Sequence, residues 1–102
     1  MALEVKFQQR AVEDLERIWQ HIAQDSENYA SAVATSIVTA AEELSEYPRI
    51  GHRVEHVVRA EVRELSVCPY RLFYAIRQDA IWILAVAHGA RDLRKPFFDR
   101  LT

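Results

Sequence analysis

Residues 62–92 read VRELSVCPYRLFYAIRQDAIWILAVAHGARD, and this stretch decides the fold. It holds three short runs rich in apolar and branched residues, a pattern typical of β-strands. The runs cover 62–67, 70–77 and 81–87. Gln78-Asp79-Ala80 separates the last two runs closely enough for them to pair as a hairpin. Pro69 donates no backbone hydrogen bond, so it belongs at the boundary between the first two. The stretch therefore predicts an antiparallel meander.

The sequence before the meander predicts one strand and two helices. Residues 3–7 alternate apolar and charged side chains, as in a half-buried strand. Gln8-Gln9-Arg10 leads into a helix in which apolar residues recur at helical spacing from Ala11 to Ile22, and which should end near Asp25. A second helix is expected from about Asn28 to Tyr47, where Pro48 stops it. Asp25, Ser26 and Asn28 are all suitable caps for that second helix. The residues expected to share one core are Trp19, Ile22, Ile37, Leu44 and Ile83.

Helices grouped before an antiparallel sheet indicate an α+β fold. We expect a single domain over residues 1–102, a two-layer sandwich in which the helical hairpin covers one face of the sheet. The other face is expected to be partly open, because no further long element is predicted. Residues 52–58 fit either a loop or an early strand, and residues 93–101 give no clear pattern.

Composition narrows the class of protein. Half of the 102 residues are hydrophobic and only 2 are glycine, as in a globular domain. Cys68 is the one cysteine, which excludes an internal disulfide, and we expect it to be a small buried side chain. No segment has the layout of a signal peptide or the length of a membrane span, so the chain is expected to be cytoplasmic and away from membranes.

Charge gives no argument for nucleic-acid binding. The formal net charge is −2, and we expect no sequence-specific DNA binding by this chain alone. The charges are uneven, however: acidic residues concentrate in the helical half and basic residues in the sheet half. A basic half of this kind can meet an acidic partner.

No metal or cofactor site is expected. His21, His52, His56 and His88 share no spacing typical of metal ligands, and two glycines cannot form a phosphate-binding loop. The chemistry that remains is a set of arginines on the meander. These are Arg59, Arg63, Arg71, Arg77 and Arg91.

Arg71 and Arg77 share one face of their strand with Phe73 and Ala75, because alternate residues point to the same side. Arginine suits planar contact with phosphate or carboxylate. The alternative is a structural ion pair at the rim of the sheet, with Glu61, Glu64 or Asp79 as the partner. His88 ends the last strand, where it can act as an acid or base or simply bond to the backbone.

Several of these residues together resemble the RelE/ParE superfamily of bacterial toxins from toxin–antitoxin pairs. The resemblance covers nearly the whole chain and lies in the order and spacing of many loose motifs. They are Phe7, Ala11, Asp14-Leu15, Ile18, Ile22, Leu44, Pro48, Gly51, Arg63-Glu64-Leu65, Tyr70-Arg71, Tyr74, Ile76, Ile83-Leu84 and 88–92 (HGARD). The family fold is a helical hairpin against an antiparallel sheet, which agrees with the fold predicted from periodicity.

The superfamily divides by activity. RelE-type toxins cut messenger RNA in the ribosomal A site without metal, with lysines, two arginines and a C-terminal tyrosine, whereas ParE-type toxins poison DNA gyrase. Arg71 and Arg91 stand at the arginine positions here, but Val62 and Glu64 replace the lysines and Phe97 replaces the tyrosine. A valine and a carboxylate cannot stabilise phosphate charge, and phenylalanine cannot donate a proton. Relatives of the YoeB kind use a near-terminal His-Tyr pair, which His88 followed by glycine does not provide.

The resemblance therefore implies a ParE-like toxin that binds DNA gyrase and is neutralised by a cognate antitoxin. One alternative is a ribosome-dependent ribonuclease that uses Arg71, Arg91 and His88. Another is an inactive module that retains antitoxin binding alone. Residues expected to contact partners are Arg63, Arg71, Arg77, Arg91, Arg94 and Lys95. An antitoxin segment that folds on binding would place its acidic residues against Arg91, Arg94 and Lys95.

Overall fold

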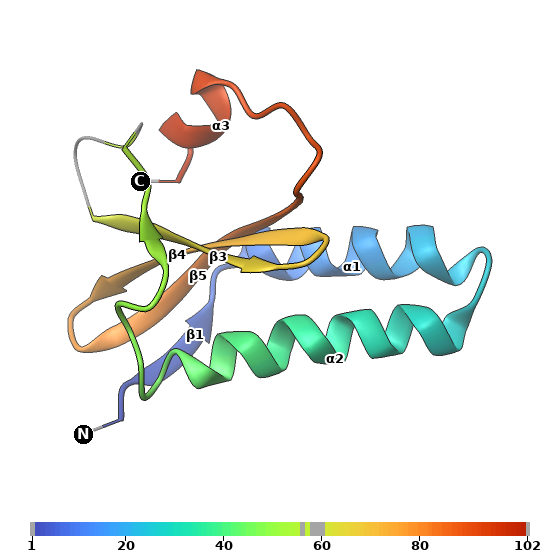
Figure 1. Cartoon of the computed structure of the whole chain (residues 1–102), viewed down its shortest axis with the longest axis horizontal. Coiled ribbons are helices and arrows are strands. Elements are labelled where there is room, and N and C mark those ends of the chain that lie inside the picture. Colours follow the sequence, from blue (N-terminus) through green and yellow to red (C-terminus); the bar gives the residue numbers. More distant parts are fainter. Residues whose placement is uncertain (1, 56, 58–60, 102) are drawn as a thin grey trace.

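The computed structural model describes residues 2–55, 57 and 61–101. The elements in chain order are β1 (Glu4–Phe7), α1 (Gln9–Ala23), α2 (Glu27–Glu43), β2 (His52–Arg53), β3 (Val62–Val67), β4 (Tyr70–Arg77), β5 (Ala80–His88) and α3 (Lys95–Asp99). The α+β prediction is confirmed, with two helices between the first strand and the meander (Figure 1). No helix among the described residues is both long and apolar enough to cross a membrane.

The predicted meander forms the centre of the sheet. β3 pairs antiparallel with β4, and β4 with β5. Gln78 and Asp79 form the turn between β4 and β5, with φ angles of 50° and 62°. Positive φ at both positions is what a two-residue hairpin turn requires, and aspartate adopts it more readily than most residues. Cys68, in the turn between β3 and β4, is exposed, so the prediction that it is buried is wrong.

The sheet is larger than the meander and is mixed. Its strand order is β1-β5-β4-β3-β2, and β1 runs parallel to β5, with Glu4 opposite Ala80 and Phe7 opposite Ile83. β2 adds two residues to the opposite edge, beside Arg63 and Glu64. The first strand in the sequence therefore lies next to the last, and the sheet is antiparallel except at that edge.

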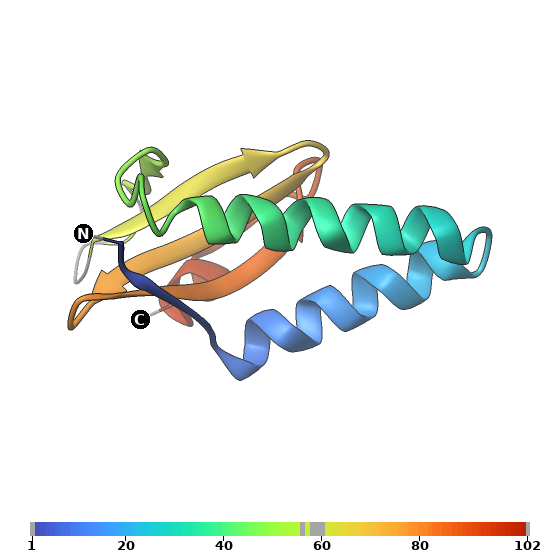
Figure 2. The same ribbon diagram turned by 90° about the horizontal axis from the view of Figure 1, so that it is seen from below.

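The helical hairpin covers one face of the sheet, as predicted (Figure 2). Ser26 is the N-cap of α2, and its Oγ accepts a hydrogen bond from the Tyr29 amide at 3.1 Å. Ile37, Leu44 and Ile83 lie in one buried cluster with strand residues such as Leu72 and Tyr74, and Ile22 packs against it. Trp19 is not part of that cluster, which corrects the predicted core. Its Nε1 donates to Ser31 Oγ across the hairpin at 3.3 Å.

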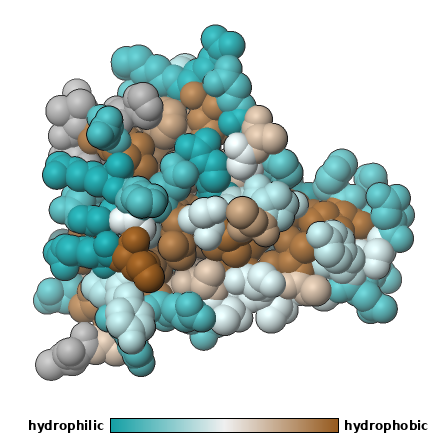
Figure 3. Space-filling model, in the orientation of Figure 1, coloured by the Kyte–Doolittle hydropathy of each residue, from teal (hydrophilic) through white to brown (hydrophobic). Residues whose placement is uncertain are grey.

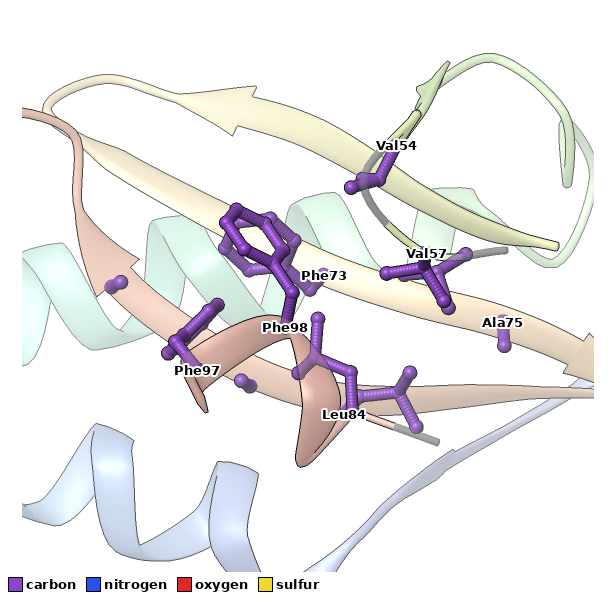
Figure 4. Close-up of a cluster of buried hydrophobic side chains, with 11 residues drawn as sticks. Val54, Val57, Phe73, Ala75, Leu84, Phe97 and Phe98 are labelled. Atoms are coloured by element: carbon purple, nitrogen blue, oxygen red, sulfur yellow. The ribbon is translucent and has the colours of Figure 1, made fainter. Parts of the chain in front are cut away.

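The opposite face of the sheet is covered as well, which corrects the expectation of an open face. Phe97, Phe98 and Leu101, in and after α3, pack on Phe73 together with Val54 and Val57 (Figure 4). The Phe73 ring lies 5.2 Å from the Phe97 ring and 6.1 Å from the Phe98 ring, both edge to face. Short irregular segments thus build the second core, which is why no periodic pattern in the sequence predicted it.

The surface is mostly hydrophilic at its rim, and apolar residues gather in a band across the middle of the face in Figure 3. Among the residues that the structure describes, three large hydrophobic side chains are strongly exposed. Tyr47 and Ile50 lie in the turn after α2, and Tyr29 lies in the first turn of α2. The helical hairpin also projects past the end of the sheet, as Figures 1 and 2 show together.

Candidate functional site

Arg71 is fixed in a bidentate ion pair. Its Nε and Nη2 donate to Glu64 Oε2 and Oε1, at 3.0 and 2.8 Å. The register places Ser66 opposite Arg71, so Glu64 lies two residues along β3 and on the same face. The hydrogen bonds to Glu64 raise the pKa of Arg71, while partial burial opposes them. Of the three carboxylates that the sequence offered for an ion pair, the structure thus pairs Arg71 with Glu64.

Two other candidate arginines hold chain segments together. Arg63 donates from Nε to Glu61 Oε2 at 2.8 Å, and from Nη1 to the Gly51 carbonyl at 2.8 Å. These contacts attach the turn before β2 to β3. Arg77 Nη2 donates to the Leu101 carbonyl at 3.4 Å. Arg59 and His56 lie outside the described residues.

The basic C-terminal segment is partly neutralised by its own carboxylates. Arg94 Nη2 lies 3.4 Å from Asp92 Oδ2, and Lys95 Nζ lies 2.9 Å from Asp99 Oδ2. Arg91 differs, because its guanidinium lies 5.8 Å from the centre of the Phe97 ring and no salt bridge to a described carboxylate forms. Arg91 is therefore the member of this group most available to a partner.

A first recess, the arginine cleft, brings Arg71 and Arg91 together. It has a volume of about 350 Å³. Its lining residues are Arg53, Val54, Glu55, Glu64, Arg71, Arg91, Asp92, Leu93 and Phe98. Three arginines face three carboxylates, so the formal charges of the lining balance. Val62, which the resemblance aligns with a lysine of RelE-type toxins, is fully buried, and Phe97 is buried in the same hydrophobic cluster.

A second recess, the histidine recess, lies between α1 and the ends of β4 and β5. It has a volume of about 400 Å³. Its lining residues are Asp14, Arg17, Ile18, His21, Tyr70, Val86, Ala87, His88 and Arg91. Of the described lining residues, Arg91 alone borders both recesses.

Asp14 is a key residue of this recess that the sequence analysis named only as part of the family resemblance, without a role. Its side chain is buried although it is charged, with only 7 % of the residue exposed. Oδ2 accepts a hydrogen bond from the Val86 amide at 2.9 Å, and Oδ1 pairs with Arg17. Its position between Ala11 and Ile18, on the apolar side of α1, was the available signal, since a carboxylate there needs a buried partner.

The end of β5 orients His88. The Ala90 amide donates to His88 Nδ1 at 3.0 Å, so the proton of the neutral ring is on Nε2. The ring packs edge to face against Tyr70 at 5.4 Å. Burial raises the pKa of Tyr70, and the neighbouring Tyr29 raises it further. The Tyr70 hydroxyl therefore stays protonated at neutral pH.

The three residues of the ribonuclease alternative do not form one site. Tyr70 pairs with His88 and Arg71 pairs with Ala87 in the β4–β5 register. Because successive residues of a strand point to opposite faces, Arg71 and His88 lie on different sides of the sheet. Arg91 shares one recess with each of them. Within the described part of the chain, no three His, Cys, Asp or Glu side chains could hold a metal ion.

The fold is similar to that of several solved proteins from toxin–antitoxin systems. The structure resembles that of a chromosomal ParDE system from P. aeruginosa, with a TM-score of 0.72 over 85 % of this chain and 96 % of that one, at 21 % identity. It also resembles an E. coli RelE variant in its free state, with a TM-score of 0.54 at 20 % identity over 88 % of this chain and 86 % of that one. A third match is the RelBE2 toxin–antitoxin complex from Mycobacterium tuberculosis, with a TM-score of 0.57 at 26 % identity over 86 % of this chain and 99 % of that one.

Sequence comparison identifies the family. The chain is 36 % identical to Toxin RelE2 of Caulobacter vibrioides over 83 residues, which are 80 % of this chain and 90 % of that protein. Residues 5–93 match the model for the ParE toxin of the type II toxin–antitoxin system parDE. This match confirms the resemblance found in the sequence and runs from Val5, within β1, to Leu93, before α3. The chain belongs to the ParE toxin family of type II toxin–antitoxin systems.

Proposed function

We propose that this toxin acts by binding DNA gyrase and trapping it on cleaved DNA, without chemistry of its own, and that a cognate antitoxin neutralises it. The observation that carries the proposal is the Glu64–Arg71 ion pair. A ribonuclease that lacks a metal needs cations free to approach the phosphate. Here the arginine best placed for that role has Nε and Nη2 of its guanidinium engaged by a neighbouring carboxylate.

The surroundings of that ion pair support the same conclusion. Three carboxylates balance three arginines in the arginine cleft, which removes the electrostatic attraction that RNA binding relies on. Phe97 has no hydroxyl and packs against Phe73, so it cannot supply a proton to a leaving group. A ParE-family scaffold with a neutralised cleft fits a toxin that works through surface contacts.

Membership of a toxin–antitoxin family supports an antitoxin as the second partner. One of the matched structures is a toxin–antitoxin complex. We expect the antitoxin to be the product of a small gene beside this one and to fold on this surface. Gyrase and the ribosome, the two candidate targets, both lie in the cytoplasm, and we place the toxin there.

The test is a reconstituted gyrase reaction. Purified toxin, gyrase, supercoiled DNA and ATP should accumulate cleaved DNA after protein removal, and cells that express the toxin alone should filament and induce DNA repair. Phe97→Tyr should leave these results unchanged and should create no ribonuclease activity, because one hydroxyl cannot replace the missing lysines. An intact gyrase cycle in the presence of excess toxin would contradict the proposal.

A ribosome-dependent ribonuclease is the second candidate, and one observation favours it. Arg53, Arg71 and Arg91 line a single cleft, as a phosphate site would require. Translating ribosomes with the toxin should then show new messenger ends at the A site, and Arg71→Ala should abolish them. Arg77→Ala, which removes an arginine outside the cleft, is the matched control. If neither assay responds while an antitoxin still binds, the chain is an inactive interaction module.

A further inference from the structure

We propose that the turn between α2 and β2 joins two copies of this chain in a symmetric dimer. The exposed turn (residues 47–50, YPRI) meets its counterpart around a twofold axis, and Arg49 of one copy pairs with Glu46 of the other. This inference goes beyond the proposed function and does not depend on which target the toxin binds. It gives a partner to apolar surface that the fold leaves uncovered.

The exposed turn presents two of the large hydrophobic side chains that stand out from the described surface. Tyr47 is 62 % exposed and Ile50 is 63 % exposed. Together with Pro48 and Arg49 they border a shallow recess of about 440 Å³. A twofold axis can place the projecting side chains of each copy in the recess of the other. Adjacent exposed apolar side chains of this kind are typical of interaction sites.

Hydrogen bonds hold the exposed turn in one conformation. The Ile50 amide donates to the Tyr47 carbonyl at 3.2 Å, which closes a β-turn with proline at its favoured second position. Arg63 Nη1 donates to the carbonyls of Arg49 and Gly51, at 3.2 and 2.8 Å. The apolar side chains are therefore in position before a partner arrives, which lowers the entropy cost of binding.

Negative charge beside the exposed turn is left without a partner. Glu43 is the last residue of α2 and Glu46 follows closely, and neither forms a salt bridge within the described part of the chain. The C-terminal end of a helix is already negative because of the helix dipole, and the last turn of α2 has no basic residue. A cation supplied by a second copy relieves this unfavourable arrangement.

Arg49 is the cation that a second copy offers. Its Nε lies 3.9 Å from Glu61 Oε2, whereas the Nε of Arg63 donates to the same oxygen at 2.8 Å. Glu61 is thus engaged mainly by Arg63, and 65 % of the Arg49 side chain remains exposed. Because Glu46 and Arg49 flank Tyr47 and Pro48 in the chain, a twofold axis through the turn forms the Arg49–Glu46 pair twice.

Other occupants fit these charges less well. DNA and an acidic protein segment would both meet Glu43 and Glu46 beside the exposed turn and be repelled. A second copy carries both signs of charge in the order that the surface requires. The dimer also leaves the histidine recess free, since β3 and β4 separate β2 from β5 in the sheet.

The size of the exposed turn predicts a weak dimer. Stable interfaces bury about 800 Å² of each partner, which is more than a turn of this length offers. Sedimentation equilibrium of the full-length toxin alone should therefore show reversible dimerisation, with a dissociation constant of about 10–100 µM. A protein that stays monomeric up to about 1 mM would overturn the proposal.

Matched substitutions locate the interface. Tyr47→Glu should weaken dimerisation by about tenfold, because symmetry removes the apolar contact twice. Tyr29→Glu makes the same change at a side chain that is 60 % exposed in the first turn of α2, and it should alter the dissociation constant by less than about twofold. Both variants should melt like the parent, since both side chains are exposed. Equal weakening by the two variants would contradict the assigned interface.

Charge exchange tests the pairing of Arg49 with Glu46. Arg49→Glu and Glu46→Arg should each weaken self-association by about tenfold, because like charges then face each other. An equimolar mixture of the two variants should form a heterodimer about as tight as the parent dimer, since both pairs are again opposite in charge. A mixture that associates no better than either variant alone would overturn the proposal. So would a Tyr47→Glu variant that loses gyrase or antitoxin binding but keeps the dimer, because the turn would then serve that other partner.

Discussion

The two faces of the sheet are covered in opposite ways. One face lies under α1 and α2, helices of 15 and 17 residues, whose apolar side chains repeat at regular spacing. The other lies under a five-residue helix and two irregular segments, held mainly by aromatic rings. Side-chain packing holds most of this second cover, although backbone groups take part, as in the hydrogen bond from the Val54 amide to the Val62 carbonyl at 2.8 Å.

This difference indicates which contacts take part in the cooperative unfolding of the whole domain. A long helical hairpin cannot leave the sheet without exposing a whole core, so its contacts belong to global unfolding. A terminal helix of five residues can detach while the sheet and hairpin remain folded, because its loss exposes only one cluster. The effects of substitutions on the two faces should therefore differ in two ways. They should differ in the size of the stability loss, and in whether the whole domain or only one segment unfolds.

The largest effect is expected under the helical hairpin. Ile37 is 1 % exposed and lies in the cluster with Ile83 and Leu44. Ile37→Ala should lower the free energy of unfolding by roughly 2–5 kcal/mol, measured by urea denaturation. Thr39→Ala, on the exposed side of the same helix, is the control and should change stability by less than about 0.5 kcal/mol. Similar losses for both variants would contradict the assigned face of α2.

A smaller and more local effect is expected under α3. Phe97→Ala removes a ring that packs on Phe73 and Phe98. A fully buried phenylalanine would cost about 3–5 kcal/mol, but we expect about 2 kcal/mol because the segment can detach. Hydrogen exchange should accelerate in residues 93–101 well before the rest of the chain. Uniform acceleration across all strands would show that the two covers unfold as one unit.

Tyr74 connects the hairpin face to the turn before β2. Removing its hydroxyl should lower stability by less than Phe97→Ala does. The Gly51 amide donates to its hydroxyl at 2.9 Å. Tyr74→Phe leaves that buried amide without a partner, at a cost of about 1–2 kcal/mol. Tyr70→Phe is the matched control, because no hydrogen bond involves its hydroxyl within the described residues.

The same pair gives a prediction for alkaline pH. Burial raises the pKa of Tyr74, against a smaller lowering by the Gly51 hydrogen bond. A raised pKa in the folded state means that this contribution to stability is complete below about pH 10 and is lost as the pH rises through the folded value. Urea midpoints above pH 10 should therefore fall less steeply for Tyr74→Phe than for the parent. An unchanged slope would contradict the assignment.

The smallest effect is expected at the surface of α3. Lys95 and Asp99 form an exposed ion pair four residues apart. Lys95→Ala should change stability by less than about 0.5 kcal/mol, because solvent and salt screen such pairs. Thermal melting would detect a larger loss, which would mean that charge rather than aromatic packing holds the terminal cover in place.

Sequence reasoning succeeded where a pattern repeats and failed where a contact joins distant or irregular segments. The hairpin and the meander follow from periods of 3.6 and 2 residues. α3 is too short for its apolar residues to show a helical period. Phe97 is buried because it packs on Phe73, a contact that only the fold reveals. Arg71 was expected to pair with one of several carboxylates, and the strand register selects Glu64. The structural role of Asp14 was missed because its partner, the Val86 amide, is 72 residues away.

The pairing of β1 with β5 has a consequence for biosynthesis. Ala80 is added 76 residues after its partner Glu4, since 80 minus 4 is 76. At bacterial elongation rates of about 5–20 residues per second, the first strand waits roughly 4–15 s for its neighbour. We expect a nascent chain stalled before residue 80 to remain without the completed sheet, which pulling-force measurements on arrested ribosomes can detect. A chain that ends before residue 80 would therefore lack the pairing of β1 with β5.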